Sequence, residues 1–123
     1  MARHLRPPRP RFIPISGPLP DDLGELEFER WVVHNAWLKG WCGFHVRNSD
    51  GVVQGVHRQL PDQHEDALGF PDWIFVRGMK VLYRELKTNH GRLSVPQMWW
   101  LSVLPDAAVW RPKDRDRILA ELE

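Results

Sequence analysis

The chain of 123 residues is predicted to form a single α/β domain in which helices flank a mixed sheet. Three features predict this class: apolar residues at helical spacing between residues 23 and 39, two apolar runs that meet at Gly78, and a helix-start pattern at Ser94. Hydrophobic residues make up 42% of the chain and seven residues are tryptophan, enough for a buried core. In chain order, the expected elements are helix, three strands, helix, strand and helix.

Residues 1–20 are predicted to be a disordered or extended arm that precedes one domain at residues 21–123. The arm contains six prolines and no acidic residue, and proline disfavours regular structure. It also carries four arginines, which can contact DNA phosphates or can simply keep a leader soluble: Arg3, Arg6, Arg9 and Arg11.

The first helix is expected from about Leu23 to Lys39, with Asp21 or Asp22 as its N-cap and Gly40 closing it. Apolar residues one turn apart mark its buried face: Phe28, Val32 and Ala36. Glu25 comes one turn before Phe28 on that face, which is an unusual place for a carboxylate because charge is rarely buried without a partner.

Trp41 to Val46 is expected to be the first strand, and residues 48–68 a long polar loop. His45 and Arg47 alternate near the end of this strand, and a half-exposed strand histidine is the simplest interpretation of His45. The loop contains histidines and acids but neither paired cysteines nor an HxxxH spacing, so no zinc site is predicted there.

The two apolar runs around Gly78 predict a β-hairpin, and glycine at the first central position suits a type II′ turn. In a symmetric loop, paired residue numbers sum to 157, which places Asp72 directly opposite Glu85. Two facing carboxylates repel each other unless a cation lies between them, and a hard divalent cation takes oxygen ligands. Lys87 projects from the same strand face as Glu85. These three side chains can form a site for metal-assisted phosphodiester hydrolysis, and a solvated face of mixed charges is the alternative.

The segment Ser94-Val95-Pro96-Gln97 fits a capping box and predicts a helix that runs to about Leu104. Gln97 can cap this helix, whose start is expected near Lys87. The large apolar residues of the helix are expected in the core rather than in a binding platform: Trp99, Trp100, Leu101 and Leu104.

A closing strand is expected at Ala107 to Trp110 and a final helix at Asp114 to Leu122. The crossover through the Ser94 helix can make the closing strand a parallel partner in the sheet.

Pro71-Asp72 followed by Glu85-Leu86-Lys87 resembles the PD-(D/E)XK nuclease signature. The wider sequence, roughly residues 23–120, is similar to the VRR-NUC, Holliday-junction-resolvase-like branch of that superfamily. Further motifs carry the resemblance in the same order: Gly69-Phe70-Pro71-Asp72, Glu85-Leu86-Lys87-Thr88, Gly91-Arg92-Leu93-Ser94, Gln97 with Trp100-Leu101, and Val109-Trp110-Arg111-Pro112. The resemblance implies a restriction-endonuclease-like αβββαβ core with a mixed central sheet flanked by helices. It also implies a divalent-metal-dependent DNA endonuclease.

The resemblance implies that Asp72, Glu85 and the Leu86 backbone carbonyl hold Mg²⁺ or Mn²⁺, while Lys87 assists the attacking water. It also implies that Gln97 lines the active site.

An acidic residue at the start of the first helix completes the site in the family, and this catalytic and metal-binding role is carried over to Glu25. Glu27 and Glu29 are neighbouring candidates, and all three can instead simply favour the helix N-terminus. DNA contacts are expected from the arginines of the arm and from His45, Arg47 and Arg92.

The implied substrate is branched or flapped DNA, bound without sequence specificity. Cutting a four-way junction needs two sites and hence a homodimer. The alternative is a catalytically weak DNA-binding module, or a nuclease subunit of a replication or recombination assembly. The net charge of +1 and the pI near 8.0 do not by themselves indicate a nucleic-acid binder, so any basic footprint must be local.

The sequence also predicts a cytoplasmic chain that is neither secreted nor inserted in a membrane. It has one cysteine, Cys42, no apolar run of membrane-spanning length, and no apolar signal region behind its N-terminal arginines.

Overall fold

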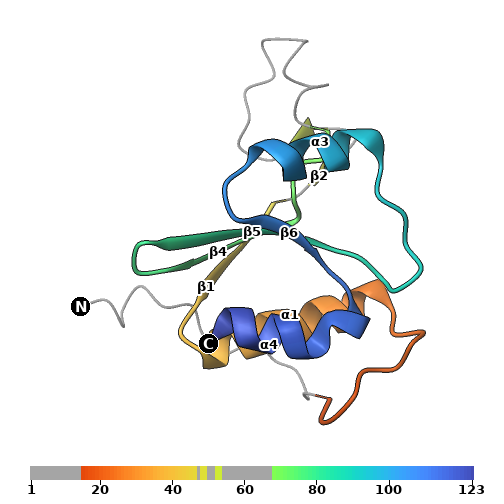
Figure 1. Cartoon of the computed structure of the whole chain (residues 1–123), viewed down its shortest axis with the longest axis vertical. Coiled ribbons are helices and arrows are strands. Elements are labelled where there is room, and N and C mark those ends of the chain that lie inside the picture. The colour runs from red at the N-terminus through yellow and green to blue at the C-terminus, as the bar shows by residue number, and fades with distance from the viewer. Residues whose placement is uncertain (1–14, 47, 50–51, 54–67) are drawn as a thin grey trace.

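The computed structural model describes residues 15–46, 48–49, 52–53 and 68–123 (Figure 1). Its secondary structure follows the predicted order, with one additional pair of short strands. The elements are α1 (Glu25–Leu38), β1 (Cys42–His45), β2 (Asn48–Ser49), β3 (Val52–Val53), β4 (Trp73–Arg77), β5 (Lys80–Leu86), α3 (Val95–Val103), β6 (Ala107–Trp110), the 3₁₀ turn η2 (Pro112–Asp114) and α4 (Arg115–Leu122). The predicted α/β class and αβββαβ order are confirmed.

Four strands form a mixed sheet in the order β1-β4-β5-β6. The first two neighbouring pairs are antiparallel, and β5 and β6 are parallel. The chain passes from β5 to β6 through α3, since a parallel pair needs a crossover connection. Figure 1 shows the sheet with α3 on one side and with α1 and α4 on the other.

The β4–β5 hairpin has the predicted register. Arg77 pairs with Lys80 at the turn, and Trp73 pairs with Arg84 at the far end of the ladder. Gly78 has φ +61°, whereas Met79 does not have a positive φ, as a type II′ turn requires. The local sequence therefore determined how β4 and β5 align.

The hydrophobic core lies between the sheet and the helices α1 and α4. The stripe predicted on α1, namely Phe28, Val32 and Ala36, is fully buried there. The same layer contains an aromatic stack, with ring centres 5.5 Å apart between Trp73 and Phe75 and 5.9 Å apart between Phe75 and Trp110. One face of the sheet thus carries most of the buried apolar side chains of the described residues.

The other face is covered in part by α3, and none of the nine residues of this helix is buried. The prediction that the large apolar residues of the helix belong to the core is therefore wrong: Trp99 is exposed, and Trp100, Leu101 and Leu104 are only half-buried. The reason lies in the tertiary structure. On its side of the sheet, α3 packs only near a second, small cluster of Val46, Phe70 and Ile74.

The start of α1 also differs from the prediction. Its N-cap is Gly24 in extended conformation, with no side-chain cap, rather than Asp21 or Asp22. The Asp21 carboxylate instead accepts hydrogen bonds from the loop after β5, at 2.9 Å from His90 Nε2 and 3.3 Å from Asn89 Nδ2. The predicted C-terminal glycine is confirmed, since Gly40 has φ +87°.

Two segment predictions need correction. The arm does not extend to residue 20, because Ile15 and Leu19 are apolar and pack against the core. The segment 48–68 is not wholly a loop: β2 and β3 pair within it, through Asn48 with Val53 and Ser49 with Val52. Val52 and Val53 are β-branched residues that favour strands, a signal that the polarity of the segment concealed.

No helix within the described residues combines the length and the apolar composition that crossing a bilayer requires.

Candidate active site

The predicted carboxylate pair lies at the open end of the β4–β5 hairpin. Asp72 directly precedes β4, and Glu85 is the next residue of β5 beyond the last pair of the ladder, Trp73 with Arg84. The backbone N–H of Leu86 donates to Asp72 Oδ2 at 3.2 Å. The Asp72 carbonyl accepts from the N–H of Val46 at 2.7 Å, which ties this position to the end of β1. The structure therefore brings Asp72 and Glu85 together as predicted.

Glu85 is a buried acid with an unusual environment, only 2% exposed. Its Oε2 accepts a hydrogen bond from Gln97 Nε2 at 3.2 Å, and its carboxyl group also lies within hydrogen-bonding reach of the Asp72 carboxylate. Burial and then the neighbouring Asp72 raise the pKa of Glu85 to about 9, while Lys87 acts in the opposite direction. Without a cation the site therefore favours a protonated Glu85.

Gln97 has both of the roles that its sequence position allows. Its side-chain Oε1 accepts from the backbone N–H of Ser94 at 2.7 Å, and its own backbone N–H donates to Ser94 Oγ at 3.2 Å, which completes the capping box. The remaining amide Nε2 donates to Glu85. The cap thus holds the side chain in the position from which it contacts the buried acid.

Gly69 places the start of α3 against the segment that leads to Asp72. It has φ +81°, and a Cβ at this position would lie 2.5 Å from the backbone N of Gln97 and 2.6 Å from the carbonyl carbon of Pro96. Only glycine allows this approach without displacement of the backbone. The close contact joins the two parts of the chain that carry the site.

Lys87 follows β5 directly, two residues after Glu85, and its side chain is half-buried. Its backbone N–H donates to the Trp110 carbonyl at 3.1 Å, so the strand geometry continues through this residue. Its ammonium is near enough to lower the pKa of Glu85 against the larger effect of burial. The predicted set of two carboxylates and one ammonium is thus assembled at one end of β5.

The carboxylates of α1 border this set. Glu25 is exposed, contrary to its expected place on the buried stripe, because the helix begins at this residue and its first turn is open. Its charge still raises the pKa of Glu85. Glu29 is half-buried and lies one turn further along; burial raises its pKa, the nearby His45 lowers it, and Asp72 and Glu25 raise it further.

Within the described parts of the chain, no three side chains of His, Cys, Asp or Glu converge as a group that could hold a metal ion. Glu25 is therefore beside the facing pair and is not brought into one ligand cluster with Asp72 and Glu85.

The predicted DNA contacts are placed only in part. His45 stacks on Trp73 with ring centres 4.7 Å apart, and its Nδ1 is 3.8 Å from Glu29 Oε1. Arg92 is exposed in the loop between β5 and α3. The remaining predicted contacts lie outside the described residues: Arg3, Arg6, Arg9, Arg11 and Arg47.

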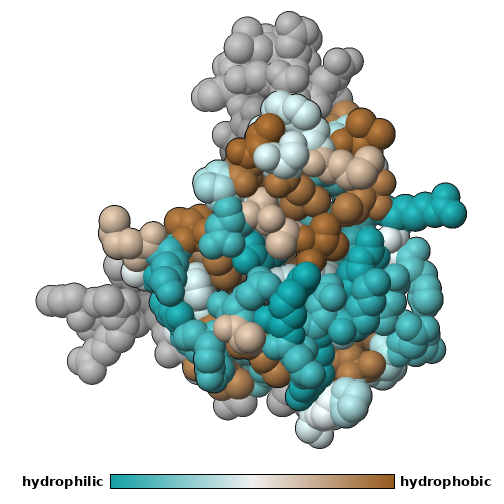
Figure 2. Space-filling model, viewed as in Figure 1, coloured by the Kyte–Doolittle hydropathy of each residue, from teal (hydrophilic) through white to brown (hydrophobic). Residues whose placement is uncertain are grey.

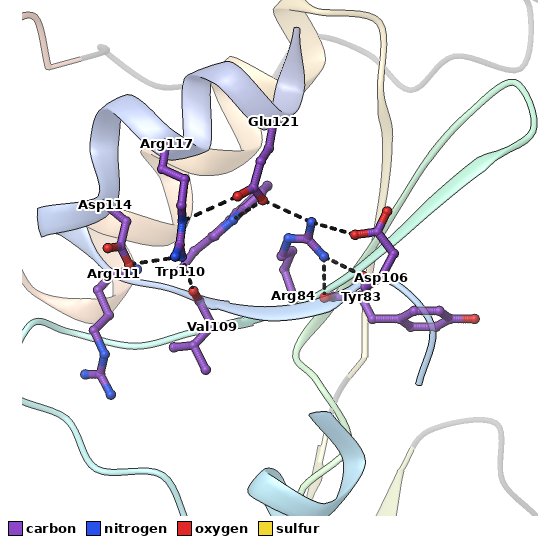
Figure 3. A network of polar contacts seen from close by, with 9 residues as sticks. All are labelled: Tyr83, Arg84, Asp106, Val109, Trp110, Arg111, Asp114, Arg117 and Glu121. Atoms are coloured by element: carbon purple, nitrogen blue, oxygen red, sulfur yellow. Dashed lines mark hydrogen bonds and ion pairs between the residues drawn. The ribbon is translucent and has the colours of Figure 1, made fainter. Parts of the chain in front are cut away.

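Arg84 is an important residue that the sequence analysis missed. Its side chain is 3% exposed, and its Nη2 lies 3.0 Å from Glu121 Oε1 and 3.1 Å from Asp106 Oδ1 (Figure 3). Its Nη1 donates to the carbonyls of Tyr83 and Asp106, and its guanidinium lies 4.9 Å from the centre of the Trp110 ring. The buried cation therefore links β5, the turn before β6, and α4.

A signal for this role was present in the sequence. Arg84 alternates with Leu82 and Leu86, which places it on the core face of β5, while its neighbour Glu85 points to the other face. A charged residue in such a position needs partners from elsewhere in the fold. Its contacts hold the strand that presents Glu85.

The fold and these side chains define an α/β protein in which a buried glutamate faces a half-buried aspartate beside a lysine. No known protein family matches the chain, and neither curated proteins nor solved structures show significant similarity to it. The likeness to VRR-NUC nucleases therefore depends on the sequence motifs, and the function has to be inferred from the site.

Proposed function

We propose that this chain is a divalent-metal-dependent endodeoxyribonuclease that hydrolyses phosphodiester bonds in branched or flapped DNA. One observation carries the proposal: the carboxyl of Glu85 is buried against the carboxylate of Asp72, and burial together with this neighbour raises the pKa of Glu85 to about 9. A protein does not retain a buried acid beside a second acid for stability, because both burial and repulsion oppose its charge. Perturbed acids of this kind are typical of functional sites.

Mg²⁺ or Mn²⁺ fits this donor set. Both are hard cations that bind carboxylate and carbonyl oxygens. Asp72, Glu85 and the Leu86 carbonyl would hold the ion, and Glu25 or Glu29 would add negative charge from α1. When bound, the ion would supply Lewis-acid polarisation of the phosphoryl group. Its charge would also favour the ionised form of Glu85, which the protein alone disfavours.

Lys87 would position the attacking water and offset the negative charge that grows on the phosphoryl oxygens in the transition state. Its position two residues after Glu85 supports this role, because it puts an ammonium on the same strand face as the acid. Gln97 would hold the Glu85 carboxylate in one orientation through its hydrogen bond. Arg92 and His45, on either side of the pair in the sequence, and the arginines of residues 1–14 would contact phosphates of the substrate.

Single-turnover cleavage of labelled four-way, flapped, nicked and linear DNA tests the proposal, with Mg²⁺, Mn²⁺ or EDTA. We expect metal-dependent cutting of branched substrates by the wild-type chain. Lys87→Ala should lose cleavage by at least about 100-fold and retain DNA and metal binding, because the ammonium acts in the transition state. Asp72→Asn should lose cleavage and also weaken metal binding, because it removes an oxygen ligand and a negative charge.

Lys80→Ala is the matched control, since it removes the same charge from the exposed opposite end of β5. It should cut at the wild-type rate. Binding of branched DNA without any metal-dependent cleavage by the wild-type chain would instead identify a DNA-binding module. Cleavage by Lys87→Ala at the wild-type rate would place the nuclease centre elsewhere.

A further inference from the structure

The turn that follows β5 lies directly behind the candidate lysine, Lys87. It consists of residues 88–91 and is closed by a hydrogen bond from the Gly91 N–H to the Thr88 carbonyl at 3.2 Å. None of its four residues has a large apolar side chain, and Figure 2 shows hydrophilic side chains on the side of the molecule where the chain runs from β5 to α3. Polar contacts, rather than hydrophobic packing, therefore hold the 88–91 turn in place.

Arg111 provides the main contacts to this turn. Its Nη1 donates to the Thr88 carbonyl and to the Gly91 carbonyl, at 2.7 Å in each case. Figure 3 shows its side chain pointing away from α4 and from the ion pairs of Glu121. A guanidinium directs its N–H groups in fixed, planar directions, so one terminal nitrogen holds both ends of the turn.

The backbone around Arg111 is itself fixed. The Arg111 N–H donates to Asp114 Oδ2 at 3.0 Å, and the next residue, Pro112, is buried. The carbonyl of the preceding residue, Trp110, accepts from the Lys87 N–H at 3.1 Å. The chain at the end of β6 thus contacts Lys87 through its backbone and the turn behind Lys87 through a side chain.

Asn89 ties the 88–91 turn to two further segments. Its Oδ1 accepts from the Lys113 backbone N–H at 2.8 Å, and its Nδ2 donates to the Asp21 carbonyl at 3.1 Å. A turn is closed by its own hydrogen bond, so these added contacts fix its position relative to the sheet and to the chain before α1.

The side chain of Lys87 lies along this turn. A Cβ on Gly91 would lie 3.4 Å from Lys87 Cδ and 3.1 Å from Thr88 Oγ1. A lysine ammonium sits on a flexible four-carbon stem, so the backbone of Lys87 alone does not fix its direction. The bare backbone of Gly91 is a wall beside this stem, and a displaced turn would displace the wall.

We propose that Arg111 is a positioning residue for Lys87. By holding the carbonyls of Thr88 and Gly91, it fixes the turn along which the lysine stem lies and so directs the ammonium towards the candidate site. The inference rests on the proposed nuclease function, in which Lys87 positions the attacking water. In this role Arg111 touches neither the water nor the substrate, and it acts only through the lysine.

Single-turnover cleavage of branched DNA by Arg111→Gln tests the inference, with DNA and Mn²⁺ both saturating. We expect the rate to fall by about 10- to 100-fold, because a small misplacement of a catalytic group is costly. The concentrations of DNA and Mn²⁺ that give half-maximal binding should change by less than about twofold, since the ligands of both are unchanged.

Asn89→Ala is a second variant that loosens the same turn and should slow cleavage by a smaller factor. Far-ultraviolet circular dichroism establishes that each variant is folded, and Asn89→Ala decides the matter if Arg111→Gln does not fold. A folded variant that cleaves at the wild-type rate would overturn the inference.

A double variant establishes whether Arg111 acts through Lys87. In the Lys87→Ala background, Arg111→Gln should slow the residual cleavage by less than about twofold, because the lysine that it positions is absent. An arginine that only stabilises the fold would slow cleavage by the same factor in both backgrounds, and that result would overturn the inference.

Arg77→Gln is the matched control. Arg77 also donates to backbone carbonyls, those of Lys39, Leu122 and Glu123, but it lies at the hairpin turn, at the opposite end of β4 from the site. This variant loses the same charge and the same kind of contact, and it should cleave at the wild-type rate.

The remaining outcomes separate this inference from the proposed function. If the wild type cleaves and Arg111→Gln cleaves equally fast, the inference is overturned and the nuclease function stands. If Arg111→Gln loses DNA affinity but keeps the saturating rate, Arg111 is a phosphate contact and the inference is again overturned. A wild-type chain that cleaves no DNA would overturn the proposed function and this inference with it.

Discussion

Glu85→Gln should stabilise the metal-free protein at neutral pH. The pKa of Glu85 is raised from 4.5 to about 9, mainly by burial and then by Asp72. Between these two pH values the folded chain keeps a proton that the unfolded chain releases. The free energy of unfolding therefore falls as pH rises, by at most about 1.4 kcal/mol per pH unit. The stabilising contribution of the proton is complete below pH 4.5 and is lost as pH rises towards about 9.

pH 7 lies about 2.5 pH units above 4.5, the lower end of this range. Over this interval the wild-type chain loses about 3 kcal/mol of its free energy of unfolding. Glutamine is neutral at every pH and can still accept the hydrogen bond of Gln97. We therefore expect Glu85→Gln to raise the free energy of unfolding by about 3 kcal/mol at pH 7 and to change it little near pH 4.

Urea denaturation in EDTA at several pH values between about 4 and 8 measures the difference. Glu27→Gln is the control, because Glu27 is exposed on the same helix turn that borders the site. Added Mg²⁺ should make the wild-type chain the more stable of the two. A metal ion that binds only the folded protein raises its free energy of unfolding, and the variant has one carboxylate fewer with which to bind the ion. If the free energies of unfolding of the wild type and of Glu85→Gln change with pH in the same way across this range, a neutral, buried Glu85 is refuted.

Three further changes have defined outcomes. In chemical denaturation, Gly69→Ala should lower the free energy of unfolding by about 2–5 kcal/mol, because this position has a positive φ and the new Cβ would overlap the backbone of Gln97. Gly78→Ala should lower it by only about 1–2 kcal/mol, because this position also has a positive φ but open space around it. Arg84→Ala should cost about 3 kcal/mol in the same assay, because the half-buried carboxylate of Glu121 loses its cation; an unchanged midpoint would show that this network is dispensable. Deleting residues 1–14 should flatten the dependence of log DNA affinity on log salt by about 0.9 for each phosphate that the arm neutralises in the full chain, and an identical slope would make the arm a passive leader.

Several parts of the fold follow from the local sequence alone. The glycine turn determines how β4 and β5 pair, and the pairing places Asp72 opposite Glu85 without any knowledge of the rest of the chain. The capping box begins α3 at the predicted residue. These features depend on backbone conformation and on neighbours within a few residues, which the sequence displays directly.

Other parts depended on contacts between distant segments. The sequence allowed Gln97 to cap a helix, but only the approach of α3 to Gly69 brings its amide to Glu85. The first helix lost its expected aspartate cap because Asp21 contacts His90, 69 residues away.

The amphipathic pattern of a helix likewise predicts that the helix has an apolar face, but it does not indicate which part of the fold covers that face. In the tertiary structure, the sheet and α4 cover the apolar face of α1. The helix α3 lies on the other side of the sheet, and none of its residues is buried. Burial depends on how the layers of the fold are assembled. Apolar residues are therefore part of the core in α1 and exposed to solvent in α3. The raised pKa of Glu85 has the same origin, because its burial and the charges around it exist only after β4, β5 and α3 have come together.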